Sequence, residues 1–92
     1  MHWLDRITPQ INYIWHGTWP PRYIEPPRYL HDHELIIFAR GTCTVELDDR
    51  RLDCPLKTFV IVPPDRRHAT HGGPAIVGRH CIHFDFSSLG PY

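Results

Sequence analysis

The sequence has no excess of charge of either sign and no long hydrophobic run. Its 92 residues hold ten Lys plus Arg and ten Asp plus Glu, so no summed positive field draws the chain toward nucleic acid. No run approaches the roughly 20 apolar residues of a membrane-spanning helix. The first ten residues also lack the basic and apolar regions of a signal peptide. We therefore predict a soluble, cytoplasmic protein with no membrane partner.

Cysteine is scarce, and helical periodicity with capping residues is missing. Cys43, Cys54 and Cys81 are an odd number without the close spacing of a disulfide framework, so we expect reduced thiols. A chain of this length makes one domain, which buries roughly 60–65% of the surface of its unfolded chain. A second domain does not fit.

What the sequence does contain is a strongly apolar stretch in the middle, HDHELIIFARG, from His31 to Gly41. The run 35–39 is rich in residues that favour β-strands and is too short for a membrane span. Gly41 then stops it. We predict that this stretch is the central strand of a β domain, buried on both faces.

The first 27 residues hold half of the ten prolines, and proline cannot donate a hydrogen bond to a sheet. Only residues 11–15 alternate well enough for a strand. We therefore predict an N-terminal arm over residues 1–27 with one strand, laid against a barrel of residues 28–92 by Trp15, Trp19 and Tyr23. Two roles stay open for these aromatic residues: they plug the end of the barrel, or they cover a ligand.

Residues 42–48 alternate polar with apolar, which is typical of a strand with one wet face. A two-residue turn at Asp49-Arg50 would set Leu47 opposite Leu52 and Val45 opposite Cys54. That register places the apolar partners on one face. Its flaw is that Glu46 then lies opposite Asp53.

Further strands are expected at residues 59–62 and from about 75 to 86, separated by turns rich in proline and glycine. Six or more short strands of this kind predict an all-β barrel or sandwich of the jelly-roll type.

Three segments together resemble the cupins, and within them the sensor domains of AraC-type transcription regulators. They are Arg28 followed by Asp32-His33-Glu34-Leu35 and Gly41, then Val62-Pro63-Pro64-Asp65-Arg66-Arg67-His68, and finally Ile82-His83-Phe84-Asp85. The resemblance covers roughly residues 10–86. It implies a double-stranded β-helix, that is, a cupin barrel, with an extended proline-rich N-terminal arm.

The resemblance also implies a function. The barrel would bind a small effector, a sugar or small acid, without catalysis and without a cofactor. Binding would control a C-terminal helix-turn-helix domain that contacts DNA and is not present in this chain. A homodimer is a further expectation. A sugar-binding or scaffold jelly roll without a regulatory role stays open as an alternative.

The effector site is predicted from strand alternation and from the family pattern. If Glu34 faces inward, Phe38 does so too, although Phe38 also suits a plain core. In the family pattern, an arginine at the position of Arg28 often binds polar effectors, and His68 lies at the rim of the pocket. Arg28 could instead form a salt bridge with Glu25 or Asp32. The predicted ligand-binding residues are Tyr13, Trp15, Arg28, Glu34, Phe38 and His68.

The runner-up is a stand-alone metal-dependent cupin enzyme, with His31, His33 and His68 as metal ligands. The spacing argues against it, because neighbouring residues on a strand point to opposite faces, which separates His33 from Glu34. The other histidine pairs, His68-x-x-His71 and His80-x-x-His83, are also split between the faces of a strand. We expect them to be ordinary surface or hydrogen-bonded residues.

Overall fold

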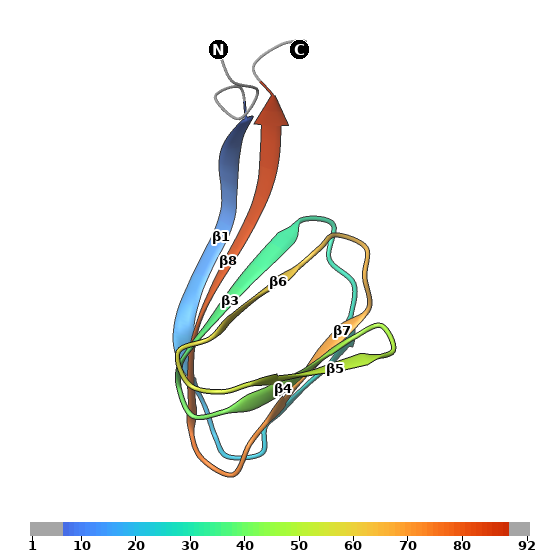
Figure 1. The fold of residues 1–92 in the computed structure, drawn as a ribbon. Helices are drawn as coiled ribbons and strands as arrows, with labels where there is room; N and C mark the ends of the chain where they lie inside the picture. Colours follow the sequence, from blue (N-terminus) through green and yellow to red (C-terminus); the bar gives the residue numbers. More distant parts are fainter. Residues whose placement is uncertain (1–6, 89–92) are drawn as a thin grey trace.

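The structure is a computed structural model that describes residues 7–88, and these residues form eight strands arranged as two sheets (Figure 1). No helix occurs within them, so none that could span a membrane. The strands are β1 (Ile7–Trp19), β2 (Ile24–Arg28), β3 (His33–Arg40), β4 (Cys43–Leu47), β5 (Arg50–Cys54), β6 (Phe59–Val62), β7 (His68–Gly72) and β8 (Val77–Ser88).

Each sheet has four antiparallel strands. Sheet A has the order β1-β8-β3-β6, and sheet B has the order β2-β7-β4-β5. The chain crosses repeatedly from one sheet to the other, and only β4 and β5 form a hairpin of consecutive strands. This is the predicted all-β architecture of the jelly-roll type. The predicted central strand is β3, which pairs with β8 on one side and β6 on the other. The prediction that both faces of this strand are buried was wrong, because only alternate residues are buried and Ile37 on the other face is 36% exposed.

The N-terminal segment contains two strands where the sequence predicted one. β1 pairs with β8 along its whole length, and β2 pairs with β7 in the other sheet. Trp15 and Trp19 pack against the core, and the ring of Tyr23 lies tilted against that of Trp19 with ring centroids 4.7 Å apart. The prolines of β2 coincide with a shift of register between Glu25 and Arg28, as expected where ladder hydrogen bonds are lost.

The register predicted for the β4–β5 hairpin was wrong: the turn lies one residue earlier than predicted, and each residue of β4 pairs two positions earlier on β5. The turn lies at Asp48-Asp49, where Asp48 adopts a left-handed conformation with φ of 52°. Val45 therefore faces Leu52, and Glu46 faces Arg51. This register replaces the like-charge contact with an opposite-charge pair, which stabilises a sheet. It also sets Cys43 opposite Cys54, and both remain free thiols.

The core lies between the two sheets and is built from inward-facing residues of alternate positions. On β3, Glu34, Ile36 and Phe38 are fully buried, as the alternation predicted. His33, one position earlier, faces outward and stacks on Phe84. The other buried apolar residues of the core are Cys43, Val45, Cys54, Val60, Val62, Val77 and Cys81.

Candidate functional site

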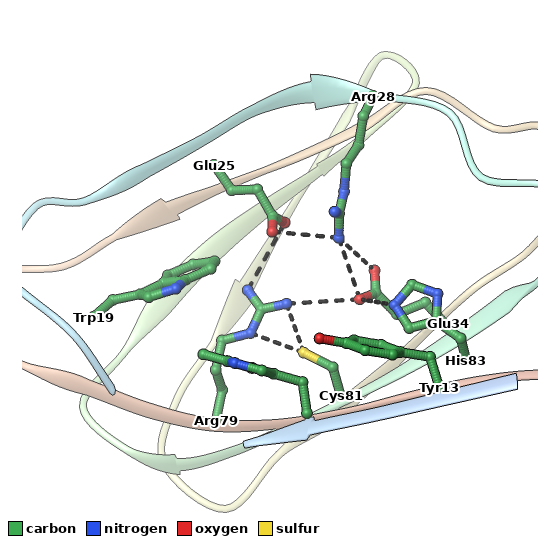
Figure 2. Close-up of a pocket in the computed structure, with 9 residues that line it drawn as sticks. Tyr13, Trp19, Glu25, Arg28, Glu34, Arg79, Cys81 and His83 are labelled. Carbon is green, nitrogen blue, oxygen red and sulfur yellow. Dashed lines mark hydrogen bonds and ion pairs between the residues drawn. The ribbon is translucent and has the colours of Figure 1, made fainter. Parts of the chain in front are cut away.

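A pocket of about 200 Å³ opens between the sheets at one end of this core (Figure 2). Strands of both sheets line it, so its side chains come from parts of the chain that are far apart in sequence. The lining residues are Tyr13, Trp15 and Trp19 of β1, Glu25 and Arg28 of β2, Glu34 of β3, and Arg79, Cys81 and His83 of β8.

Glu34 is the central carboxylate of the pocket, although none of its surface is exposed. Nη2 of Arg28 donates to both of its oxygens at 3.3 Å. His83 Nε2 lies 3.1 Å from Oε2, and His68 Nε2 lies 3.3 Å from Oε1. Nη2 of Arg79 is 3.7 Å from Oε2. Figure 2 shows the two guanidinium groups approaching this carboxylate from different strands.

These contacts decide the charge of Glu34. Burial raises the pKa of its carboxyl group, but the hydrogen bond from His68 and the charges of Arg28, His83 and Arg79 outweigh burial and leave the pKa lowered. The side chain is therefore a carboxylate at neutral pH, held by cations rather than by water.

Arg79 is the second buried ion of the pocket, with 2% of its surface exposed. Its guanidinium carbon lies 4.0 Å from the ring centroid of Trp19, a cation–π contact. Its Nε and Nη2 lie 3.0 and 2.8 Å from the sulfur of Cys81. Burial raises the pKa of Cys81 despite the opposing charge of Arg79, so Cys81 is a neutral thiol at pH 7.

Two buried polar atoms of the pocket have no hydrogen-bond partner among the described residues 7–88. Oε1 of Glu25 and Nη1 of Arg79 lie 3.9 Å apart, which is too far for a hydrogen bond. Buried polar groups are nearly always paired. A group that completes this pair must accept a hydrogen bond from Arg79 and donate one to Glu25, and a hydroxyl group does both.

His83 connects the pocket to the outer surface of the barrel. Its Nδ1 lies 3.2 Å from Oδ1 of Asp32, and the amide of Asn12 donates to Asp32 and to Asp85 at 3.0 and 2.9 Å. Burial raises the pKa of Asp32, but the hydrogen bonds from Asn12 and His83 outweigh it and the pKa is lowered. Asn12 lies at an irregularity in the β1–β8 pairing, and the ring of Tyr13 beside it meets His83 edge-on.

The structure brings together four of the six residues predicted to bind ligand: Tyr13, Trp15, Arg28 and Glu34 all line the pocket. Phe38 lies in the core cluster instead, which is the alternative left open for it. His68 is fully buried rather than at the rim. Its Nε2 lies 3.3 Å from Nε of Arg28 and 3.3 Å from Oε1 of Glu34. His68 therefore contacts both side chains and helps to hold them in position.

Five residues of the pocket were not predicted as ligand-binding residues, namely Trp19, Glu25, Arg79, Cys81 and His83. A signal for three of them is present in the sequence. Arg79, Cys81 and His83 stand at every second position of β8, so they share one face. Glu25 was weighed as a salt-bridge partner of Arg28, and it does pair with Arg28, at 3.3 Å, while lining the pocket.

The three histidines considered as metal ligands do not converge. The His31 side chain is 98% exposed and faces Asp65, His33 points out of the barrel, and His68 lies inside it. Over residues 7–88, no group of three or more His, Cys, Asp or Glu side chains is arranged to hold a metal ion. The residues present therefore do not fit a metal centre, because guanidinium groups already neutralise the central carboxylate.

In sequence, the family model for the AraC-like ligand binding domain matches residues 9–89. No curated protein matches the chain.

Solved structures with this fold share little sequence with the chain. A cupin with a double-stranded β-helix fold from Methanocaldococcus jannaschii is 19% identical with a TM-score of 0.70, over 76% of this chain and 66% of that one. A cupin superfamily protein from Desulfitobacterium hafniense is 14% identical with a TM-score of 0.71, over 88% and 80%. A structure of DMSP lyases is 16% identical with a TM-score of 0.71, over 86% and 40%. The chain spans less than two thirds of the first and the last of these proteins, and such low identities show the fold alone.

Proposed function

Because the chain belongs to the family of AraC-like ligand-binding domains, we propose that its pocket binds a small uncharged metabolite that carries hydroxyl groups, such as a sugar. The observation that carries this proposal is the unpaired couple of Glu25 Oε1 and Arg79 Nη1 in the pocket wall. A ligand hydroxyl would complete both hydrogen bonds at once.

The charges of the pocket favour a neutral ligand over a small acid. The side chains facing the cavity include two guanidinium groups, Arg28 and Arg79, and two carboxylates, Glu25 and Glu34. Each arginine already contacts both carboxylates. A ligand carboxylate could accept a hydrogen bond from Nη1 of Arg79, but it would lie beside Oε1 of Glu25, which has no proton to donate. Two neighbouring carboxylates repel each other, whereas a hydroxyl group suits both atoms.

The size and walls of the pocket also suit a small ligand. Its volume of about 200 Å³ lies below the range of roughly 300–1,000 Å³ that is typical for drug-sized molecules. Tyr13, Trp15 and Trp19 supply flat apolar surfaces on the side of β1. The combination of apolar walls with a few convergent polar groups is typical of metabolite-binding sites.

The proposed biological role is effector sensing in a cytoplasmic bacterial AraC-type transcription regulator. In this role the domain acts as a homodimer and controls DNA binding by a C-terminal helix-turn-helix domain. The effector shifts the balance between two states only by its different affinity for each. Family membership supports this role.

A thermal-shift screen of monosaccharides, polyols and small carboxylic acids tests the ligand class. A sugar or polyol at about 100 times its dissociation constant adds about 2.7 kcal/mol of stability, which raises the Tm of a domain of this size by more than about 8 °C. Glu25→Gln replaces one carboxylate oxygen by an amide nitrogen that donates and removes the negative charge, so it should weaken the binding. Glu46→Gln, on the outer face of sheet B, is the matched control and should not. Stabilisation by acids alone would overturn the proposal.

A further inference from the structure

His16 and His80 face each other on the outer side of sheet A. They are direct cross-strand partners in the antiparallel pairing of β1 with β8, the two long strands that run side by side in Figure 1. Trp15 and Arg79, their neighbours in sequence, line the pocket on the inner side of the sheet. Because side chains alternate along a strand, both histidines point away from the pocket.

The two imidazole rings lie close together and open to solvent. Their ring centroids are 5.7 Å apart, their planes meet at 30°, and both residues are exposed. Within residues 7–88, neither ring forms an ion pair or a hydrogen bond. The histidine side chains that do so there are His31, His68, His71 and His83. The ring nitrogens of His16 and His80 are therefore available to a ligand.

The spacing of the rings suits a shared metal ion. An imidazole nitrogen binds Zn²⁺ at about 2.0–2.1 Å, so one ion bound by two rings holds their centroids roughly 4.5–6.5 Å apart. The observed 5.7 Å lies inside this range. Rotation about the side-chain bonds of the exposed rings turns one nitrogen of each toward the ion. Both side chains stand on paired strands rather than on loops, so their backbone positions are already set.

We propose that His16 and His80 form a two-histidine site for a divalent late first-row metal ion such as Zn²⁺. Imidazole is a common ligand of Zn²⁺, Cu²⁺ and Ni²⁺. Water fills the other positions around the ion, because the site is open to solvent. This site is distinct from the metal centre of the barrel interior considered above, which needs three or more converging side chains.

The surroundings of the pair limit its affinity for metal. Ile37 lies beside His80 in the same row of the sheet, and Arg40 lies opposite Gly78 in the next row. Neither side chain serves as a third ligand, and the positive charge of the guanidinium group opposes a bound cation. We therefore expect a dissociation constant on the order of 1–100 µM.

Calorimetric titration of the tag-free chain with Zn²⁺, from about 1 µM to 1 mM free metal so as to span this constant, tests the proposal. The expected result is one Zn²⁺ per chain. His16→Asn and His80→Asn should each weaken this binding at least tenfold. His31→Asn is the matched control, because the His31 side chain is 98% exposed and faces Asp65 rather than a second histidine, and it should bind Zn²⁺ like the wild type. No binding, binding that survives both substitutions, equal loss in the control, or one ion per two chains overturns the proposal.

His16→Phe separates metal binding from ring stacking, because phenylalanine keeps an aromatic ring opposite His80 but has no ligand nitrogen. Without metal, the Tm of this variant should stay close to that of the wild type. Zn²⁺ at about 100 times its dissociation constant should raise the wild-type Tm by several degrees, because the ion joins the edge strand β1 to β8 only in the folded chain. A chelator should reverse this rise. An equal rise in His16→Phe overturns the proposal. Neither outcome bears on the pocket, which lies on the other side of the sheet and is tested by the screen of sugars and acids.

Discussion

Nη2 of Arg28 lies 3.3 Å from both carboxylate oxygens of Glu34, so one cationic nitrogen bridges a carboxylate that has no exposed surface. The two residues belong to different sheets. Their contact therefore ties sheet B to sheet A at the pocket, with Arg79 as a second cation on the same carboxylate. Removing one partner of such a buried cluster leaves uncompensated charge.

We predict that Glu34→Gln destabilises the fold and flattens its dependence on pH. The pKa of Glu34 is lowered in the folded protein from its ordinary value of 4.5. Its contribution to stability is therefore present above about pH 4.5 and is lost as pH falls through the folded pKa. The wild-type Tm should drop between pH 5 and pH 3. The variant should lose about 3–5 kcal/mol at pH 7 and change less over that acid range. Glu46→Gln is the control, and its Tm should depend on pH as that of the wild type does. If the Tm of Glu34→Gln fell with pH as steeply as that of the wild type, Glu34 would not be the group responsible.

The three cysteines should be unreactive in the folded protein. Burial raises the pKa of Cys43 to about 11, and Cys54 and Cys81 are also buried, with raised pKa values. With a pKa of about 11, roughly one Cys43 in a thousand is a thiolate at pH 8, and the thiolate is the reactive form. A thiol reagent should therefore label the native chain slowly. In guanidinium chloride, which unfolds the chain, it should label all three cysteines rapidly. Rapid labelling of one site in the native chain would show that a thiol is accessible.

A substitution at Phe38 tests whether this residue contributes to core packing alone or also to ligand binding. It is fully buried in the core cluster and does not line the pocket, so Phe38→Leu should lower the free energy of unfolding by about 1–2 kcal/mol. Phe59→Leu is the matched control, because Phe59 is 66% exposed and its change should stay within about 0.5 kcal/mol. Denaturant titration measures both. A ligand found in the thermal-shift screen should raise the Tm of Phe38→Leu as much as that of the wild type. A smaller rise in the variant would show that Phe38 contributes to ligand binding.

The apolar run of β3 predicted a central strand. Strand alternation predicted that His33 and Glu34 point to opposite faces and that Phe38 faces inward if Glu34 does. Alternation is a local property of a strand, so it can be read without knowing the partners. The three motifs of the family pattern then predicted the barrel and placed Arg28 and Glu34 in one pocket, although not in contact with each other.

The pairing of Glu25 with Arg79 could not be predicted in the same way. The two residues are 54 positions apart and belong to different sheets, so their meeting depends on the register of several strands at once. The predicted register was also wrong at the β4–β5 hairpin. There the turn moved by one residue, to Asp48-Asp49, and every cross-strand partner on β5 moved by two. The left-handed backbone of Asp48 and the pairing of Glu46 with Arg51 accompany this register.

Gly41 ends β3, and we predict that any side chain at this position destabilises the fold. Its φ of +74° lies in the left-handed region, and a Cβ atom would fall against the backbone carbonyl oxygen of Ile76. The conformational strain costs about 1–2 kcal/mol for alanine, and the backbone clash adds to it. Gly78→Ala is the comparison, because its φ is not left-handed and its Cβ would lie 3.0 Å from Cβ of Arg40 and at ordinary contact distances of 3.7 and 3.9 Å from the backbone N and Cα of the same residue.

Gly41→Asn separates the two causes. Asparagine tolerates the left-handed region better than alanine does, so strain alone would make Gly41→Asn the milder change. The Cβ clash is the same for both residues. If the clash dominates, the denaturation midpoints of Gly41→Ala and Gly41→Asn should fall together, both well below that of Gly78→Ala. A clearly more stable Gly41→Asn would show that the loop before β8 moves aside and that only the φ angle requires glycine.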